Sequence, residues 1–173
     1  SRIAVEWFDA QLKKAIAEMD DLFSKYRLSE ALMCVYKLFW DEFSSWYLEM
    51  IKPGYQQPID AITLKATLHY FEQLCLLLHP FMPFITEELW QNIEERAEGE
   101  SIMTQQQAKV SDFNKQIIED VEEIKNIIAG IRTIRLEKNI PNKNVLSLEV
   151  SGNYKESYAS VILKMANLDK IEK

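Results

Sequence analysis

Residues 5–26 read VEWFDAQLKKAIAEMDDLFSKY, and this stretch decides the fold class. Its apolar side chains recur at steps of three and four residues, which is the spacing of one face of an α-helix. The members of that face are Val5, Phe8, Leu12, Ala15, Ile16, Met19, Leu22, Phe23 and Tyr26. The stretch therefore predicts one long amphipathic helix, whose apolar face has to pack against further helices.

The same spacing recurs in four later segments. It predicts helices over residues 29–52, 58–79, 83–98 and 112–138, separated by Pro53-Gly54, by Pro80 with Pro83, and by a connector over 99–111 that lacks helical periodicity. We therefore expect a mainly α protein, with a five-helix bundle over residues 1–140. Gly130 lies inside the last of these helices, where it costs about 1 kcal/mol relative to alanine, and it suggests a close helix contact.

The period changes after residue 140. Leu146, Leu148 and Val150 alternate with polar residues, as in a half-buried strand, and a short helix follows with Tyr158, Val161, Ile162 and Met165 on one face. Residues 168–171 can begin a second strand. Residues 141–173 are thus predicted to start a small mixed β/α appendage of β-α-β type, which is truncated here.

The composition excludes several classes of protein. Hydrophobic residues make up 47% of the 173 residues and charged residues 27%, which argues against disorder, and four Gly and five Pro argue against an all-β fold. No apolar run is long enough to span a membrane, and no signal peptide is visible. Cys34 and Cys75 are expected to be free thiols. A cytoplasmic protein is expected.

Residues suited to bond chemistry do not converge. His69, Cys75 and His79 do not have the spacing of a zinc site, and neither histidine completes the Glu-x-x-His motif of a carboxylate di-metal bundle. Adjacent carboxylates such as Glu87-Glu88 point about 100° apart on a helix. A phosphate-binding glycine loop and a nucleophile beside a base are both missing. We therefore expect no catalytic residue, no metal and no cofactor in this chain.

One segment is strongly basic in an acidic chain. The net charge of the chain is −7, which disfavours a nucleic-acid partner, but a local basic face can still bind phosphates. Residues 124–143 carry a single acidic residue, Glu137, against five cations, which are Lys125, Arg132, Arg135, Lys138 and Lys143. A helix stripe of this kind suits a phosphate backbone. Alternatively, these cations complement the dipole at the end of a helix without any ligand.

Three longer motifs resemble a known family. The run Trp40-Asp41-Glu42-Phe43-Ser44-Ser45-Trp46-Tyr47-Leu48-Glu49, followed by Lys52-Pro53, resembles a helix of valyl-tRNA synthetases. The run from His79 to Trp90, HPFMPFITEELW, is similar to a segment shared by the isoleucyl, leucyl and valyl enzymes. The run Ile131 to Lys138 with Ile140-Pro141 resembles the last bundle helix and its exit.

This resemblance implies a helical anticodon-binding domain of a class I aminoacyl-tRNA synthetase. Its parent enzyme would join valine to its tRNA with ATP and magnesium, and its partners would be valine tRNAs, the missing catalytic domain and a missing C-terminal coiled coil. The His-Ile-Gly-His and Lys-Met-Ser-Lys-Ser signatures of the ATP site do not occur in this chain. The same module of an isoleucyl or leucyl enzyme, or a helical protein-interaction scaffold, remains an alternative.

The resemblance also sorts the candidate residues. The RNA-binding candidates are Arg132, Arg135, Lys138, Lys143 and Lys125, with Lys52 and Tyr55 as further ones. The aromatic residues of the motifs are expected in the core, and they are Trp40, Phe43, Trp46, Tyr47, Phe81, Phe84 and Trp90. Pro80 and Pro83 are expected to shape the corner between two helices. Charge reversal of Arg132 and Arg135 is expected to weaken tRNA binding and to leave the helices intact.

Overall fold

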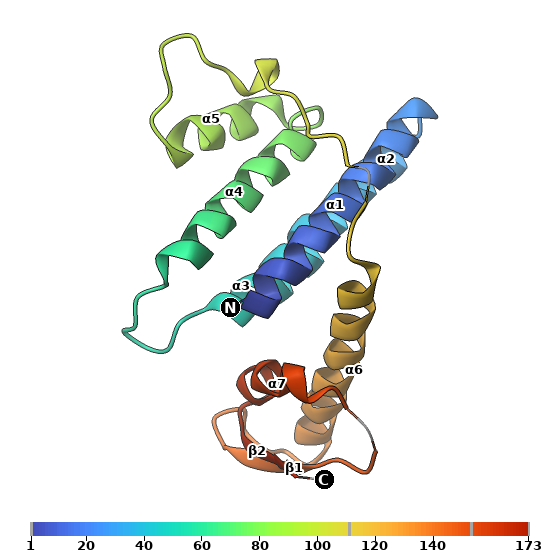
Figure 1. The fold of residues 1–173 in the computed structure, drawn as a ribbon, viewed down its shortest axis with the longest axis vertical. Helices are drawn as coiled ribbons and strands as arrows, with labels where there is room; N and C mark the ends of the chain where they lie inside the picture. The colour runs from blue at the N-terminus through green and yellow to red at the C-terminus, as the bar shows by residue number, and fades with distance from the viewer. Residues whose placement is uncertain (1, 111, 153, 173) are drawn as a thin grey trace. The chain divides into compact units, whose positions relative to one another are not determined.

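The chain divides into two compact units, Ser1–Asn114 and Lys115–Lys173. The computed structural model describes residues 2–110, 112–152 and 154–172, and Figure 1 shows its elements. The fold is mainly helical with one small sheet, which confirms the predicted class. The division falls after residue 114, whereas the sequence analysis placed the end of the bundle at residue 140. The fifth predicted helix therefore groups with the β-α-β segment.

The first unit is built from helices joined by an aromatic core. Its helices are α1 (Arg2–Ser24), α2 (Leu28–Lys37), η1 (Leu38–Tyr47), α3 (Leu48–Ile51), α4 (Ala61–Leu78), α5 (Pro83–Ile93) and the short η2 (Ile102–Thr104). Phe8 of α1 is fully buried, and its ring centroid lies 4.9 Å from that of Tyr47 and 5.1 Å from that of Tyr70. Three helices thus meet around one ring, as the long apolar face of residues 5–26 requires.

The segment from α2 to α3 is one continuous helix with a π-helical middle, η1. The buried residues Ala31, Val35, Leu38, Phe43, Tyr47 and Met50 follow steps of four, three, five, four and three, and Ile51, the last residue of α3, is buried as well. A step of five does not return to the same face of an α-helix, but the wider turn of a π-helix brings Leu38 and Phe43 onto one face. The hydroxyl of Ser44 donates to the carbonyl of Phe39 at 2.9 Å, and Ser45 donates likewise to Trp40.

The wider turn corrects part of the predicted core. Tyr47, Phe43 and Trp90 are buried as expected, with exposed fractions of 4% or less, and Trp46 and Phe81 are half-buried. The prediction is wrong for Trp40, which is 58% exposed on the outer side of η1, and for Phe84, which is 91% exposed in the first turn of α5.

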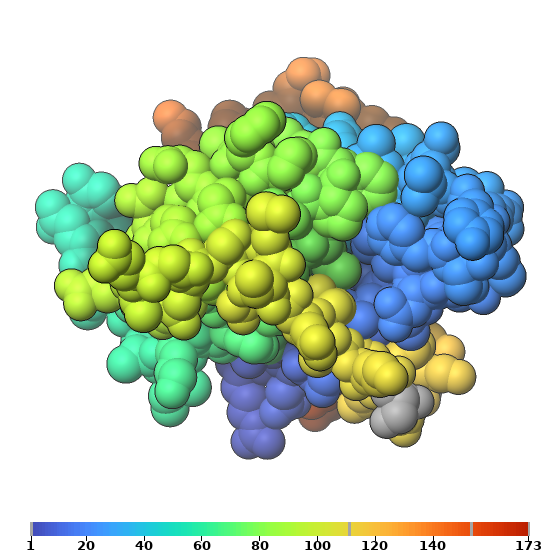
Figure 2. Space-filling view, turned by 90° about the horizontal axis from the view of Figure 1, so that it is seen from above, coloured from blue at the N-terminus to red at the C-terminus, as the bar shows by residue number. Residues whose placement is uncertain are grey.

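The corner between α4 and α5 is formed by the second motif. Pro83 is the first residue of α5, and Pro80 lies in the turn before it. His79 caps α4 and places its Nδ1 2.7 Å from the hydroxyl oxygen of Thr86. After α5, Ile102 packs with Cys75 and Trp90 in a small apolar cluster. Figure 2 shows the connector (yellow) running from α5 (yellow-green) towards α1 (blue).

The second unit is a helix followed by a β-α-β arrangement. It consists of α6 (Lys115–Glu137), β1 (Leu146–Glu149), η3 (Glu156–Tyr158), α7 (Ala159–Ala166) and β2 (Leu168–Glu172). The two strands pair in parallel, and α7 packs on α6 and on β2. The predicted strand, short helix and second strand are all present. A Cβ atom built at Gly130 meets no heavy atom within 4 Å, so the predicted close helix contact there is wrong.

No helix in the described part of the chain combines the length and the hydropathy that crossing a membrane requires.

Candidate nucleic-acid interface

The end of α6 carries three exposed cations. Arg132 lies near the end of the helix, Lys138 follows its last residue, and Lys143 lies in the loop before β1. The acidic residue among them, Glu137, is exposed as well. This end of the second unit therefore presents net positive charge to solvent.

The loop over residues 138–145 begins with a defined helix-ending turn. Asn139 has a left-handed φ of 52°, and its N–H donates to the carbonyl of Leu136 at 3.1 Å. The N–H of Ile140 donates to the carbonyl of Arg135 at 2.8 Å. These two bonds form a Schellman motif, which satisfies carbonyls at the helix end. Further on, the N–H of Asn144 donates to Pro141 at 3.0 Å, so the backbone around Lys143 is fixed.

Arg135, which the sequence suggests as an RNA contact, does not present its charge to solvent. Its side chain is buried, with the residue only 3% exposed. Its guanidinium donates to four main-chain carbonyls, which are those of Pro141 (3.3 Å), Asn144 (2.9 Å), Ala166 (3.0 Å) and Asn167 (3.0 Å). A glutamate at this position would place a carboxylate against these four carbonyl oxygens, so we now expect charge reversal of Arg135 to destabilise the second unit.

The spacing of Arg135 from the apolar residues of α6 indicates that it is buried, although its charge alone suggests an exposed residue. Arg135 lies four residues after Ile131 and seven after Ile128, which is the spacing of the buried stripe of α6. Lys125 lies in the same stripe, with a side chain 8% exposed and its Nζ 3.5 Å from a carboxylate oxygen of Glu122. Lys125, another residue predicted to contact RNA, therefore does not present its side chain to solvent either.

Arg132 remains on the exposed side of α6. One of its terminal nitrogens donates to the carbonyl of Met165 at 3.3 Å, which holds the side chain beside the end of α7. Arg132 and Arg135 of α6 therefore both bond carbonyls at the C-terminal end of α7, but only Arg132 is exposed to solvent.

Lys52 and Tyr55 lie in the first unit, directly after α3. Both are exposed, and Tyr55 is 91% exposed. The ammonium of Lys52 lies 3.5 Å from a carboxylate oxygen of Glu49. An exposed tyrosine ring can stack on a base, and an exposed lysine can contact a phosphate.

The two units differ in charge. Residues 115–173 contain ten Lys or Arg and nine Asp or Glu, whereas residues 1–114 contain ten and eighteen. The acidity of the chain thus belongs to the first unit. A polyanion meets less repulsion at the second unit, and the exposed cations at the end of α6 make that end attractive to it.

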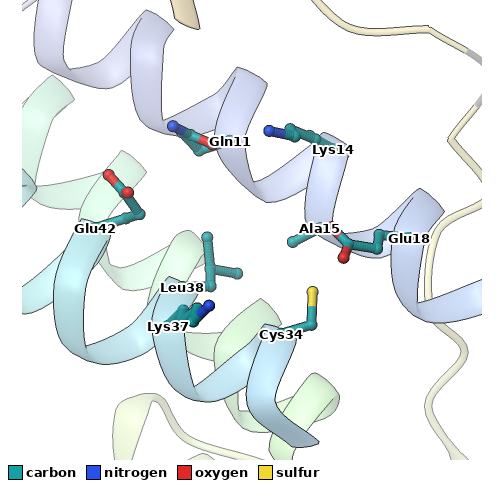
Figure 3. A pocket seen from close by; sticks show the side chains of 8 residues that line it. All are labelled: Gln11, Lys14, Ala15, Glu18, Cys34, Lys37, Leu38 and Glu42. Atoms are coloured by element: carbon teal, nitrogen blue, oxygen red, sulfur yellow. The ribbon is translucent and has the colours of Figure 1, made fainter. Parts of the chain in front are cut away.

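One cavity, of about 150 Å³, lies between α1 and the α2–η1 helix. Figure 3 shows its lining, in which the two lysines Lys14 and Lys37 accompany the two carboxylates Glu18 and Glu42. Cys34 lies in it, and burial, with a smaller contribution from Glu18, raises the pKa of its thiol to about 11, which leaves it unreactive. Within residues 2–110, 112–152 and 154–172, no three His, Cys, Asp or Glu residues are grouped so as to hold a metal ion.

Comparison with known proteins finds that the chain is similar to one domain of tRNA ligases. Residues 5–150 match the model of a family described as the anticodon-binding domain of tRNA ligase. The valine–tRNA ligases of Parabacteroides distasonis and Porphyromonas gingivalis are 61% and 51% identical to it over 173 residues, which is 100% of this chain and 20% of each ligase. That of Pseudothermotoga lettingae is 34% identical over 87% of this chain and 17% of its own length. The chain thus spans about a fifth of the length of the curated relatives that it matches.

Proposed function

The chain belongs to the anticodon-binding domain family of tRNA ligases, and on that premise we propose that it binds the anticodon stem-loop of valine tRNA within a valine–tRNA ligase. The family match over residues 5–150 supports RNA as the ligand, and the relatives support valine as the amino acid. The parent enzyme would use ATP and magnesium at residues outside this chain, and we propose a cytoplasmic location for it.

One observation carries the proposed binding surface, which is the group of exposed cations Arg132, Lys138 and Lys143 around a hydrogen-bonded loop. Phosphate contacts from such side chains position RNA and depend on salt, because binding releases counterions. Lys52 and Tyr55 are proposed as a second contact on the first unit, where the ring of Tyr55 can stack on an unpaired base.

The proposal is tested in the full-length ligase by removing two cations from the surface. We expect Lys138→Ala with Lys143→Ala to weaken binding of valine tRNA and to reduce the slope of log K against log salt by about 1.5, as two lost phosphate contacts require. The matched control is Lys25→Ala with Lys170→Ala, which removes two exposed lysines that pair with Asp21 and Glu172.

The control pair is expected to leave both the affinity and the salt slope unchanged. If both double variants lost the same affinity for tRNA, only the net charge of the chain would matter. If the affinity of the Lys138→Ala, Lys143→Ala variant were unchanged, the RNA would bind at another surface. If the affinity of the ligase for valine tRNA did not change with salt, the exposed cations of this chain would not contribute to RNA binding. The alternative of a helical protein-interaction scaffold, which binds its partner through apolar contacts, would then be favoured for this chain.

A further inference from the structure

The guanidinium of Arg135 joins two segments that are far apart in the sequence. One terminal nitrogen, Nη1, donates to Pro141 and Asn144, which lie on either side of Lys143 in the loop. The other, Nη2, donates to Ala166 and Asn167 at the end of α7. A single side chain therefore fastens the loop over residues 138–145 to a helix that begins some twenty residues later.

The end of α7 suits a buried cation. Its last carbonyls carry the negative end of the helix dipole, and Asn167 ends the helix in the left-handed conformation with φ of 51°. The amide of Asn167 adds a second tie to the loop, because its Nδ2 donates to the carbonyl of Asn142 at 2.8 Å. The loop is thus held at its middle by two side chains, and neither of them is one of the exposed cations.

The chemistry of these bonds requires arginine. The planar fork of a guanidinium reaches two acceptors on each side, whereas a lysine ammonium is a compact group on a flexible stem with three donors. All four acceptors are neutral carbonyls, so the positive charge of Arg135 is not cancelled by a carboxylate in these bonds. Its charge adds to the potential of Lys138 and Lys143, which favours an approaching phosphate.

We propose that Arg135 is a positioning residue for RNA binding, which holds Lys138 and Lys143 against the phosphate backbone through the loop over residues 138–145 without touching the RNA. The inference rests on the proposed function, since it assigns a role to a residue behind the proposed surface. The inference predicts coupling between these residues: exchanging Arg135 for lysine, which keeps the charge, should remove the contribution of Lys138 and Lys143 to the affinity and nothing more.

The experiment is a mutant cycle in the full-length ligase, with affinity for valine tRNA measured between about 50 and 200 mM salt. Arg135→Lys keeps the charge and loses the fork. We expect it to weaken binding and lower the salt slope about as much as Lys138→Ala with Lys143→Ala does, roughly tenfold in affinity. Adding Arg135→Lys to the Lys138→Ala, Lys143→Ala variant should then lower the affinity for tRNA by less than about a further twofold.

Two further variants separate positioning from loss of folding. Asn167→Gly suits the left-handed conformation and removes the side-chain ties to the carbonyls of Asn142 (2.8 Å) and Asn144 (3.5 Å), so it is expected to act in the same direction and more weakly. Asp120→Asn weakens the second unit at the other end of α6, where Asp120 bonds Tyr158. At a temperature where it stays folded, it should leave the tRNA affinity and the salt slope unchanged.

The outcomes distinguish this inference from the proposed function. If the lysine pair weakens binding but Arg135→Lys and Asn167→Gly leave the salt slope unchanged, Arg135 is only structural and the inference fails alone. Additive losses in the cycle overturn it as well, because Arg135 would then act independently of the lysines. If the lysine pair itself has no effect, the proposed surface fails and the inference fails with it.

Discussion

Asp120 should make the second unit sensitive to acid. It is 9% exposed on α6, and its carboxylate accepts hydrogen bonds from Gln116 at 2.8 Å and from the hydroxyl of Tyr158 at 3.0 Å. It also pairs with the ammonium of Lys155. Lys155 and Tyr158 lie directly before α7, so the carboxylate fastens the start of α7 to α6.

The direction of the pKa shift fixes the pH dependence. Burial is the largest single influence and would raise the pKa of Asp120, but the bonds from Lys155, Gln116 and Tyr158 together outweigh it and lower the pKa below its ordinary value. A lowered pKa in the folded state contributes stability that is present above the pKa of the unfolded chain, about 4. That stability is lost as the pH falls through the lower folded value. The second unit should therefore lose stability below about pH 4.

The magnitude for Asp120→Ala follows from what its partners can do afterwards. Tyr158 is buried, so its hydroxyl would lose its acceptor at a cost of roughly 1–3 kcal/mol. The side chain of Lys155 is 47% exposed and can return to water, so the lost ion pair adds about 0–1 kcal/mol. We expect a total of about 2–3 kcal/mol at pH 7, the middle of the combined range.

The assay is urea denaturation of the full chain at pH 7 and at pH 3, followed by hydrogen exchange of the amides of α7. Tyr158→Phe is the matched control, because it removes the same hydroxyl bond, leaves the carboxylate with its other donors, and should cost about 1 kcal/mol. The reasoning would be refuted if Asp120→Ala were as stable as the wild type at pH 7, or if it kept the wild-type loss of stability between pH 7 and pH 3.

Two other predictions concern single residues. Gly130→Ala is expected to stabilise the second unit by about 1 kcal/mol in thermal denaturation, because the position is helical and open; a loss of stability would show that a neighbour occupies that space. At pH 8, Cys34 should react with iodoacetamide about a hundredfold more slowly than a free cysteine, since burial first and Glu18 second raise its pKa to about 11. Fast labelling of Cys34 in the folded chain would contradict this.

The helices could be predicted from the sequence because each buries one face. The spacing of apolar residues located the helices around Leu12, Leu74 and Ile124, and the change to alternation located β1 at Leu146. Helix ends were less accurate. The third helix was expected from Pro58, but α4 starts at Ala61, where the side chain of Asp60 accepts the N–H of Thr63 at 2.8 Å. The sequence allows two beginnings for this helix, one with Pro58 in the first turn and one with Asp60 as the N-cap, and the structure has the second.

The core of the α2–η1 helix could not be predicted with an α-helical period. A regular α-helix that buries Val35 and Phe43 also carries Phe39 on the same side. The π-helical turns rotate the residues that follow Lys37, so Trp40 faces solvent while Phe43 and Tyr47 stay in the core. Phe43 packs there against Phe8, with ring centroids 5.2 Å apart. That contact is between residues distant in the sequence.

The candidate site shows the limit of charge as a signal. Arg132, Arg135 and Lys138 follow one another at steps of three, and composition treats them alike, yet one is buried and two are exposed. On an α-helix a step of three turns the side chain by about 60° from its predecessor, so three such residues cover too wide an arc to share one environment. The apolar stripe through Ile131 decides which of them is inside. A buried arginine in that stripe needs acceptors, and the helix end of α7 supplies carbonyls whose dipole favours a cation. The two alternatives for the basic segment therefore do not exclude each other: Arg135 bonds carbonyls at a helix end, whereas the proposed phosphate contacts are the exposed cations Arg132 and Lys138.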